Sequence, residues 1–115
     1  MYHGFMTIAV NIEGKNNNVY KFIRLLEPML PVDNEAYVYM LTKKGKDGEE
    51  IIEFGETDNF FKLTQEESKF ETIKDYLFNL NDKYLYILPE ISKVKREEIL
   101  KNLLPPFPTI KTDHE

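Results

Sequence analysis

Few residue types in this chain of 115 residues could perform chemistry. The chain contains no cysteine, which excludes a disulfide framework, a thiolate metal site and a cysteine nucleophile. Its two histidines, His3 and His114, lie near opposite ends, so we expect neither a multi-histidine metal site nor a Ser-His-Asp triad. Residues 45–48 lack the spacing of a Walker phosphate loop. Carboxylates, lysines and tyrosines remain as the groups that could bind or react.

The carboxylates are concentrated in the middle of the chain. The formal net charge is −5, from 15 Lys+Arg and 20 Asp+Glu, and residues 49–75 hold nine acidic residues against three lysines. Nucleic-acid affinity depends on Lys and Arg that neutralise phosphates, so this stretch predicts weak or no nucleic-acid binding. It forms either an ordinary solvated surface or an acidic face, residues 49–75, that binds a protein partner of basic character.

Length and hydropathy predict one domain over residues 1–115. No apolar run approaches the ~20 residues that a membrane-spanning helix needs, so we expect no membrane association. The first residues do not resemble a secretory signal, and we therefore expect a cytoplasmic protein.

Patterns in the first 35 residues predict a strand and a short helix. Apolar and polar residues alternate over 5–12, which is typical of a half-buried strand, and residues 13–18 form a turn rich in Gly and Asn. The next apolar residues have helical spacing and predict a short helix: Val19, Phe22, Ile23 and Leu26. Prolines then predict a loop over 28–35.

The rest of the chain predicts an α+β fold, in which flanking helices cover a central antiparallel sheet. Strands over 36–42 and 49–55 form a hairpin, and a third strand covers 84–88. A helix over 65–80 begins at a capping box of Thr64 and Glu67. A last helix, over 93–104, begins after Ser92, with Leu103 and Leu104 toward the core. The N-terminal strand extends the sheet or covers one edge.

Two short motifs on the hairpin, and a third near the C-terminus, carry a family resemblance. The first strand bears Tyr37-Val38-Tyr39, and the second leads into Glu53-Phe54-Gly55-Glu56-Thr57-Asp58-Asn59. The last helix bears Glu97-Glu98-Ile99-Leu100, ahead of Pro105-Pro106-Phe107-Pro108. In this order the motifs resemble those of the GIY-YIG nucleases. The resemblance implies a β-β-α-β-α core over 36–108 with residues 1–35 as an extension.

The resemblance also implies a chemistry and the residues that carry it. GIY-YIG nucleases cleave DNA phosphodiesters with one divalent metal held by a helix glutamate, which here matches Glu97, or Glu98 if the register is shifted by one. Tyr39 matches a tyrosine that assists the attacking water, and Gly55 matches the family glycine. The cation nearest to the position of the phosphate-clamping arginine is Lys62.

The sequence departs from the family pattern at several of these positions. Glu53 stands where the second motif has a tyrosine, and Leu63 stands where the family has its arginine. Further departures are Tyr37 for the first-motif glycine, Glu67 for a histidine and Pro108 for the terminal asparagine. The odd-numbered positions 37, 39, 41 and 51, 53, 55 predict that Tyr39 and Glu53 share one face of the sheet.

These departures leave three readings of function open. The first is a GIY-YIG-like protein with a degenerate site that serves as a non-catalytic binding or regulatory module, for which we expect no cofactor. The second is an active DNA endonuclease in which Glu53 and Glu97 hold Mg²⁺ or Mn²⁺ and Lys62 replaces the arginine. The third is a small acidic interaction or inhibitor protein unrelated to nucleases.

Overall fold

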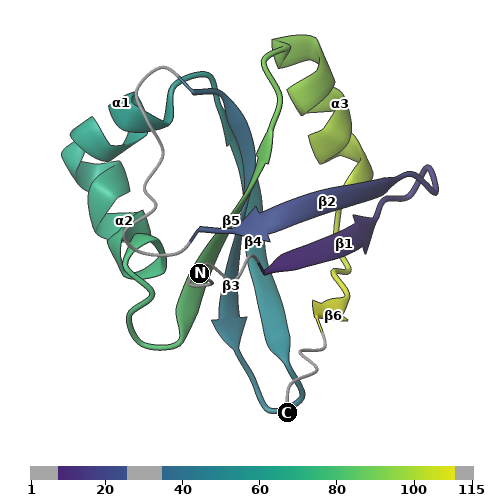
Figure 1. Ribbon diagram of the computed structural model, residues 1–115, viewed down its shortest axis with the longest axis horizontal. Coiled ribbons are helices and arrows are strands. Elements are labelled where there is room, and N and C mark those ends of the chain that lie inside the picture. The colour runs from purple at the N-terminus through teal and green to yellow at the C-terminus, as the bar shows by residue number, and fades with distance from the viewer. Residues whose placement is uncertain (1–7, 26–34, 111–115) are drawn as a thin grey trace, which may run out of the picture.

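The computed structural model describes residues 8–25 and 35–110, which form an α+β fold (Figure 1). Its elements, in chain order, are β1 (Ala9–Glu13), β2 (Val19–Arg24), β3 (Tyr37–Lys44), β4 (Glu49–Thr57), α1 (Phe60–Gln65), α2 (Glu67–Leu77), β5 (Lys83–Pro89), α3 (Lys93–Asn102) and β6 (Thr109–Ile110). Within these described ranges no helix is long and apolar enough to cross a membrane.

The strands form one antiparallel sheet in the order β1-β2-β5-β3-β4-β6. β3 lies in the middle and pairs with β4 along one side and with β5 along the other. The predicted antiparallel sheet is thus confirmed, and the N-terminal strand extends it through β2. β6, a strand of two residues beside β4, was not predicted.

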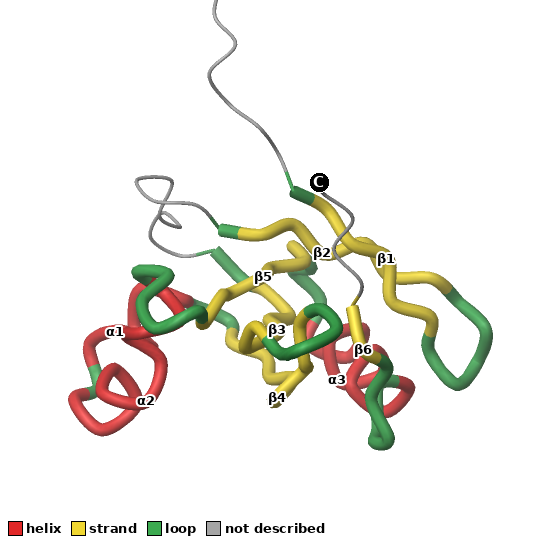
Figure 2. Tube along the Cα trace, turned by 90° about the horizontal axis from the view of Figure 1, so that it is seen from below, coloured by secondary structure: helices red, strands yellow, loops and turns green. Residues whose placement is uncertain are grey.

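Helices cover both faces of the sheet (Figure 2). We call the cluster beneath α1 and α2 the α2-side core; its buried members are Leu25, Tyr37, Leu41, Phe60, Ile73, Leu77 and Leu85. The cluster on the other face, against which α3 packs, is the α3-side core; its buried members are Ile12, Phe22, Val38, Met40, Ile51, Tyr86, Leu103 and Ile110. Neighbouring residues of β3 alternate between these two cores, as the period of a strand requires.

The sheet curls around the α3-side core. Ile12 of β1 and Ile110 of β6 belong to this one cluster, although their strands are the two outer strands of the sheet. Right-handed twist between neighbouring strands accumulates across a sheet and brings its edges round. The curl therefore brings β1 close to the C-terminal segment of the described chain.

The predicted helix over 19–26 is wrong, because its described part is strand β2. The turn before it closes a hairpin: Asn17 has a positive φ of 68°, and the side-chain oxygen of Asn16 accepts a hydrogen bond from the Asn18 amide at 3.1 Å. Phe22 then lies fully buried between more exposed neighbours, as strand alternation requires. Short apolar runs fit both periods, and here the turn and the pairing with β1 decide for a strand.

The predicted helix over 65–80 corresponds to α2, and a separate helix that was not predicted, α1, precedes it. The side chain of Asn59 accepts a hydrogen bond from the Lys62 amide at 3.1 Å and thereby caps α1. Thr64 lies inside α1, and the residue that precedes α2 is Glu66, so the predicted capping box is wrong. Leu80 lies beyond α2 and is half exposed.

α3 begins where it was predicted and ends slightly earlier. The Ser92 hydroxyl accepts a hydrogen bond from the Lys95 amide at 3.2 Å, which confirms the predicted cap. Leu103 is buried, but Leu104 is 52% exposed, so its predicted place in the core is wrong. Most of the loop predicted over 28–35 lies outside the described residues.

Candidate functional site

The register between β3 and β4 places Tyr39 and Glu53 on the same face of the sheet. Tyr39 lies opposite Gly55, and Leu41 lies opposite Glu53. Directly opposed residues share a face, so Tyr39, Gly55 and Glu53 all face the α2-side core, which confirms the prediction. A bulge follows at Ile52, and it returns Ile51 to the α3-side core, against the simple odd-numbered pattern.

The Tyr39 ring lies directly over Gly55. A Cβ atom on Gly55 would stand 2.4 Å from both Cζ and the hydroxyl oxygen of Tyr39, far inside van der Waals contact. Glycine is therefore required at this position by the close approach of the ring. The match to the family glycine thus has a local physical reason in this chain.

Tyr39 keeps its proton. Burial raises the pKa of its hydroxyl, and the negative charges of Glu53 and Glu56 raise it further. A group that activates water needs a pKa near the working pH if it is to take a proton. A tyrosine would need a lowered pKa to meet this requirement, but the surroundings of Tyr39 raise its pKa.

Glu97 and Glu98, which match the family's metal ligand, lie on the other side of the sheet from Tyr39 and Glu53. Glu97 and Glu98 are exposed on α3, whose residues Ile99 and Leu100 pack against the α3-side core, on the other side of the sheet. Across the described ranges, no group of three or more His, Cys, Asp or Glu side chains could hold a metal ion. Glu53 lies on the α2 side of the sheet and Glu97 on the helix that packs on the other side, so the structure does not bring this predicted pair to one face.

Lys62 lines a polar hollow of about 230 Å³ at the point where β4 ends and α1 follows. We call it the motif-end hollow, because it follows Gly55 directly. Its walls come from the end of β4, from α1 and from the first turn of α3: Glu56, Thr57, Asp58, Asn59, Lys62, Glu66, Lys93 and Arg96. Three acidic and three basic side chains line it, so its charge is balanced.

Arg96 is the residue of this region that sequence reasoning missed. It is 2% exposed, its Nε donates to Glu56 Oε1 at 2.7 Å, and its Nη1 donates to the carbonyl oxygens of Glu90 and Ile91 at 3.0 Å each. The signal was present in the spacing, because position 96 precedes Ile99 and Leu103 on the buried stripe of α3. An arginine on such a stripe indicates a buried ion pair.

A second buried network ties β2 to the centre of the sheet. Arg24 pairs with Glu49, which is only 2% exposed, and Arg24 Nη2 also donates to the Tyr86 hydroxyl at 3.0 Å. Tyr86 in turn donates to Glu49 Oε1 at 2.7 Å, and Thr42 Oγ1 donates to the same oxygen at 2.8 Å. Burial, followed by the hydrogen bond to Glu49, raises the pKa of Tyr86. Both carboxylate oxygens of Glu49 are satisfied within the protein.

Several acidic residues of 49–75 are buried or paired with cations. Glu49 is buried and Glu56 pairs with Arg96, so neither adds free charge to the surface. Asp75 lies 3.6 Å from the Lys83 ammonium on β5, and Glu71 lies 2.9 Å from Lys74. The acidic face stays a prediction, because exposed carboxylates remain in this stretch: Glu50, Glu53, Asp58, Glu66 and Glu71.

Comparison of the chain with protein-family models, with curated proteins and with solved structures finds no match. The relation to GIY-YIG nucleases therefore stays a prediction that depends on the motifs and on the order of the elements.

Proposed function

We propose that this chain is a degenerate member of the GIY-YIG nuclease family that acts as a non-catalytic binding or regulatory module. The order β3, β4, α1, α2, β5, α3 supports the family relation, because it follows the expected β-β-α-β-α core with the first helix split. The packing of Tyr39 over Gly55 supports it further, since these two positions carry the hairpin motifs.

The observation that carries the loss of catalysis is the position of Glu97. It is exposed on α3, and α3 packs on the opposite side of the sheet from Tyr39 and Glu53. A one-metal nuclease needs the metal carboxylate and the water-activating groups around one phosphate. Residues divided between two faces of a sheet do not meet this requirement.

The cations support the same conclusion. The family's arginine is Leu63 in this sequence, and removal of one donor that stabilises transition-state charge typically costs ~10²–10³ in rate. Lys62 is exposed, and an ammonium does not reproduce the forked hydrogen bonds of a guanidinium. Arg96 is engaged by Glu56 and by two backbone carbonyls.

Incubation of supercoiled and branched DNA with the protein in Mg²⁺ and in Mn²⁺ tests the proposal. We expect no nicking by the wild-type chain and only weak duplex binding at physiological salt. Glu97→Ala and Glu98→Ala proteins, purified in parallel, serve as matched controls for the two possible registers of the metal ligand. Metal-dependent nicking that disappears in either variant would overturn the proposal and favour an active endonuclease with an altered site. Nicking that survives in both does not come from the family's metal site.

An interaction protein unrelated to nucleases is the second candidate. The observation that favours it is an open strand edge on β1 beside a groove that none of the hairpin motif residues lines. This candidate shares the expectation of binding without catalysis.

A further inference from the structure

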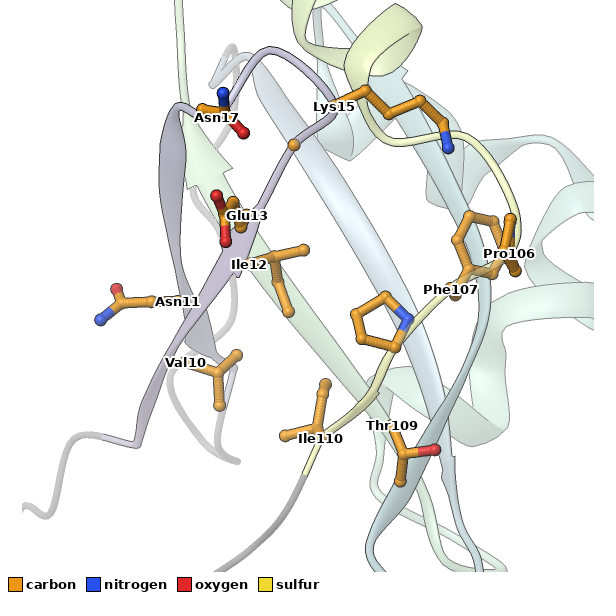
Figure 3. Close-up of a pocket in the computed structure, with 12 residues that line it drawn as sticks. Val10, Asn11, Ile12, Glu13, Lys15, Asn17, Pro106, Phe107, Thr109 and Ile110 are labelled. Atoms are coloured by element: carbon orange, nitrogen blue, oxygen red, sulfur yellow. The ribbon is translucent and has the colours of Figure 1, made fainter.

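A groove of about 840 Å³ runs between β1 and the segment from Pro106 to Ile110 (Figure 3). Its two walls are the outer strands β1 and β6 with the residues next to them, which the curl of the sheet turns toward one another. At one end the Lys15 amide donates to the carbonyl of Asn102 at 2.9 Å and joins the β1–β2 hairpin to the end of α3. The groove is thus a gap between two strand edges that a helix closes at one end.

The edge of β1 that faces away from β2 carries backbone groups that have no partner among the described residues. Arg24 donates its amide to Ile8, and Gly14 donates its amide to Asn18, each at 2.8 Å. In an antiparallel pair, residues that form hydrogen bonds to the partner strand alternate with residues that do not. The amides and carbonyls of the even-numbered residues of β1 therefore form hydrogen bonds with β2. The odd-numbered residues direct theirs to the other side: Ala9, Asn11 and Glu13. Within the described ranges, β2 is the only strand that pairs with β1.

Side chains give the groove an apolar floor and a polar rim. Ile12 and Ile110 are buried in the floor, with Val10 and Phe107 half-buried beside them. The outward-facing side chains of β1 are exposed, and the last of them is Glu13. The opposite wall, 106–110, carries no charged residue, and the charged residues of the lining are Glu13 on β1 and Lys15 in the turn that follows it.

β1 also lacks the usual protection of an edge strand. Proteins blunt such edges with lysine, proline or a bulge, because an open row of amides and carbonyls recruits another strand. Ala9–Glu13 contains none of these residues, and its register with β2 is regular throughout.

We propose that this groove binds an extended segment of another protein, which adds to β1 as an antiparallel strand. The segment has alternating character: apolar residues opposite Val10 and Ile12 face the floor, polar residues face outward, and a basic residue lies opposite Glu13. Opposite charges in directly paired positions stabilise a sheet, and the net charge of −5 on the chain favours a basic ligand. This inference names a partner for the binding role proposed above. It does not depend on a relation to GIY-YIG nucleases.

The pentapeptide acetyl-Lys-Val-Thr-Val-Thr-amide is a suitable probe. In antiparallel pairing its lysine lies opposite Glu13, its two valines face the floor, and its central threonine bonds Asn11. We expect titration of the isotope-labelled full chain with millimolar peptide to shift the amide resonances of Ala9, Asn11 and Glu13. The exchange of these outward amides with solvent slows when the added strand covers them.

Matched peptides test the direction of the hydrogen bonds. N-methylation of the central threonine removes an amide that points at β1, and we expect binding to weaken about tenfold or more. N-methylation of the second valine removes an amide that points away from β1, and we expect binding to change little. Equal effects of the two modifications would overturn strand addition to β1.

Variants of the protein test the charge and the edge. We expect Glu13→Lys to weaken binding about two- to fivefold and a peptide with glutamate in place of its lysine to restore it. Glu98→Lys makes the same charge change on α3 and should leave binding unchanged. Asn11→Pro removes an outward amide that the β1–β2 ladder does not use, and should abolish binding while the β2 resonances keep their positions.

Three results would overturn the inference. The first is no shift of the Ala9–Glu13 amide resonances in millimolar peptide, and the second is a loss of binding in Glu98→Lys as large as in Glu13→Lys. The third is a shift of the β1 resonances that grows with protein concentration in the absence of peptide. The last result would assign the groove to a second copy of this chain. The DNA nicking assay tests the proposed loss of catalysis, and the peptide titration tests binding in this groove. Failure of one proposal can therefore be distinguished from failure of the other.

Discussion

At the scale of single residues, the closest packing in the site lies between Gly55 and the Tyr39 ring. Replacement of Gly55 by alanine puts a methyl group 2.4 Å from ring atoms, so the ring must move out of its place against the α2-side core. We expect Gly55→Ala to lower the free energy of unfolding by about 1–3 kcal/mol, as measured by urea denaturation.

Two comparisons isolate this contact. At Gly45 a new methyl would meet only the flexible side chain of Glu50, so Gly45→Ala should cost much less than Gly55→Ala. In a Tyr39→Ala background the clash is absent, and the cost of Gly55→Ala should fall accordingly. Equal costs with and without the Tyr39 ring would contradict the proposed contact.

Tyr86 makes stability depend on alkaline pH. Its pKa is raised above the ordinary value of 10.0 in the folded protein, so above that value the folded state holds a proton that the unfolded state has lost. The contribution of Tyr86 to stability is therefore full below pH 10 and is lost as pH rises through its raised pKa. We expect Tyr86→Phe to be less stable at neutral pH, because a hydrogen bond to Glu49 is lost, but to show a shallower decline above pH 10. Urea denaturation across that range measures both effects, and an unchanged slope would contradict this role of Tyr86.

At the scale of elements, Arg96 joins the first turn of α3 to β4. It binds Glu56 and the two carbonyls that precede the helix, so its loss leaves several polar groups without their partner. We expect Arg96→Lys to destabilise the protein by about 1–3 kcal/mol, since the ammonium cannot make all three bonds. Glu97→Ala changes an exposed neighbour and should stay within ~0.5 kcal/mol. Similar values for the two variants would contradict the anchoring role of Arg96.

The sequence predicted best those elements in which the spacing of apolar residues fits only one type of secondary structure and in which cap or turn residues mark the ends. Ser92 marks the start of α3, and the hairpin strands have turn residues between them, so β3, β4, β5 and α3 lie within a few residues of their predicted bounds. Residues 19–24 satisfy helical and strand spacing equally, and only the pairing with β1 resolves them. Asn59 and Thr64 both have side chains that suit a helix cap, and the structure uses Asn59.

At the scale of the whole molecule, the shared face of Tyr39 and Glu53 was predictable and the position of Glu97 was not. Strand alternation and the hairpin register are local, and they determine the first relation. The side of the sheet that a helix covers depends on the path of the chain after β5, which no local pattern specifies. The pairs Arg24–Glu49 and Arg96–Glu56 join distant segments, and although the spacing of Arg96 on α3 indicated a buried arginine, the sequence did not identify either partner.

The separation of Glu97 from Tyr39 and Glu53 is tested most directly by titration of the isotope-labelled chain with Mn²⁺, whose unpaired electrons broaden nearby amide resonances. Because the carboxylates lie on opposite sides of the sheet, we expect no Mn²⁺ site whose affinity depends on Glu53 and Glu97 together. Glu97→Ala and Glu53→Gln should each leave the broadening near the other residue unchanged. A single tight site that broadens all three and disappears in both variants would contradict the proposed loss of the metal centre.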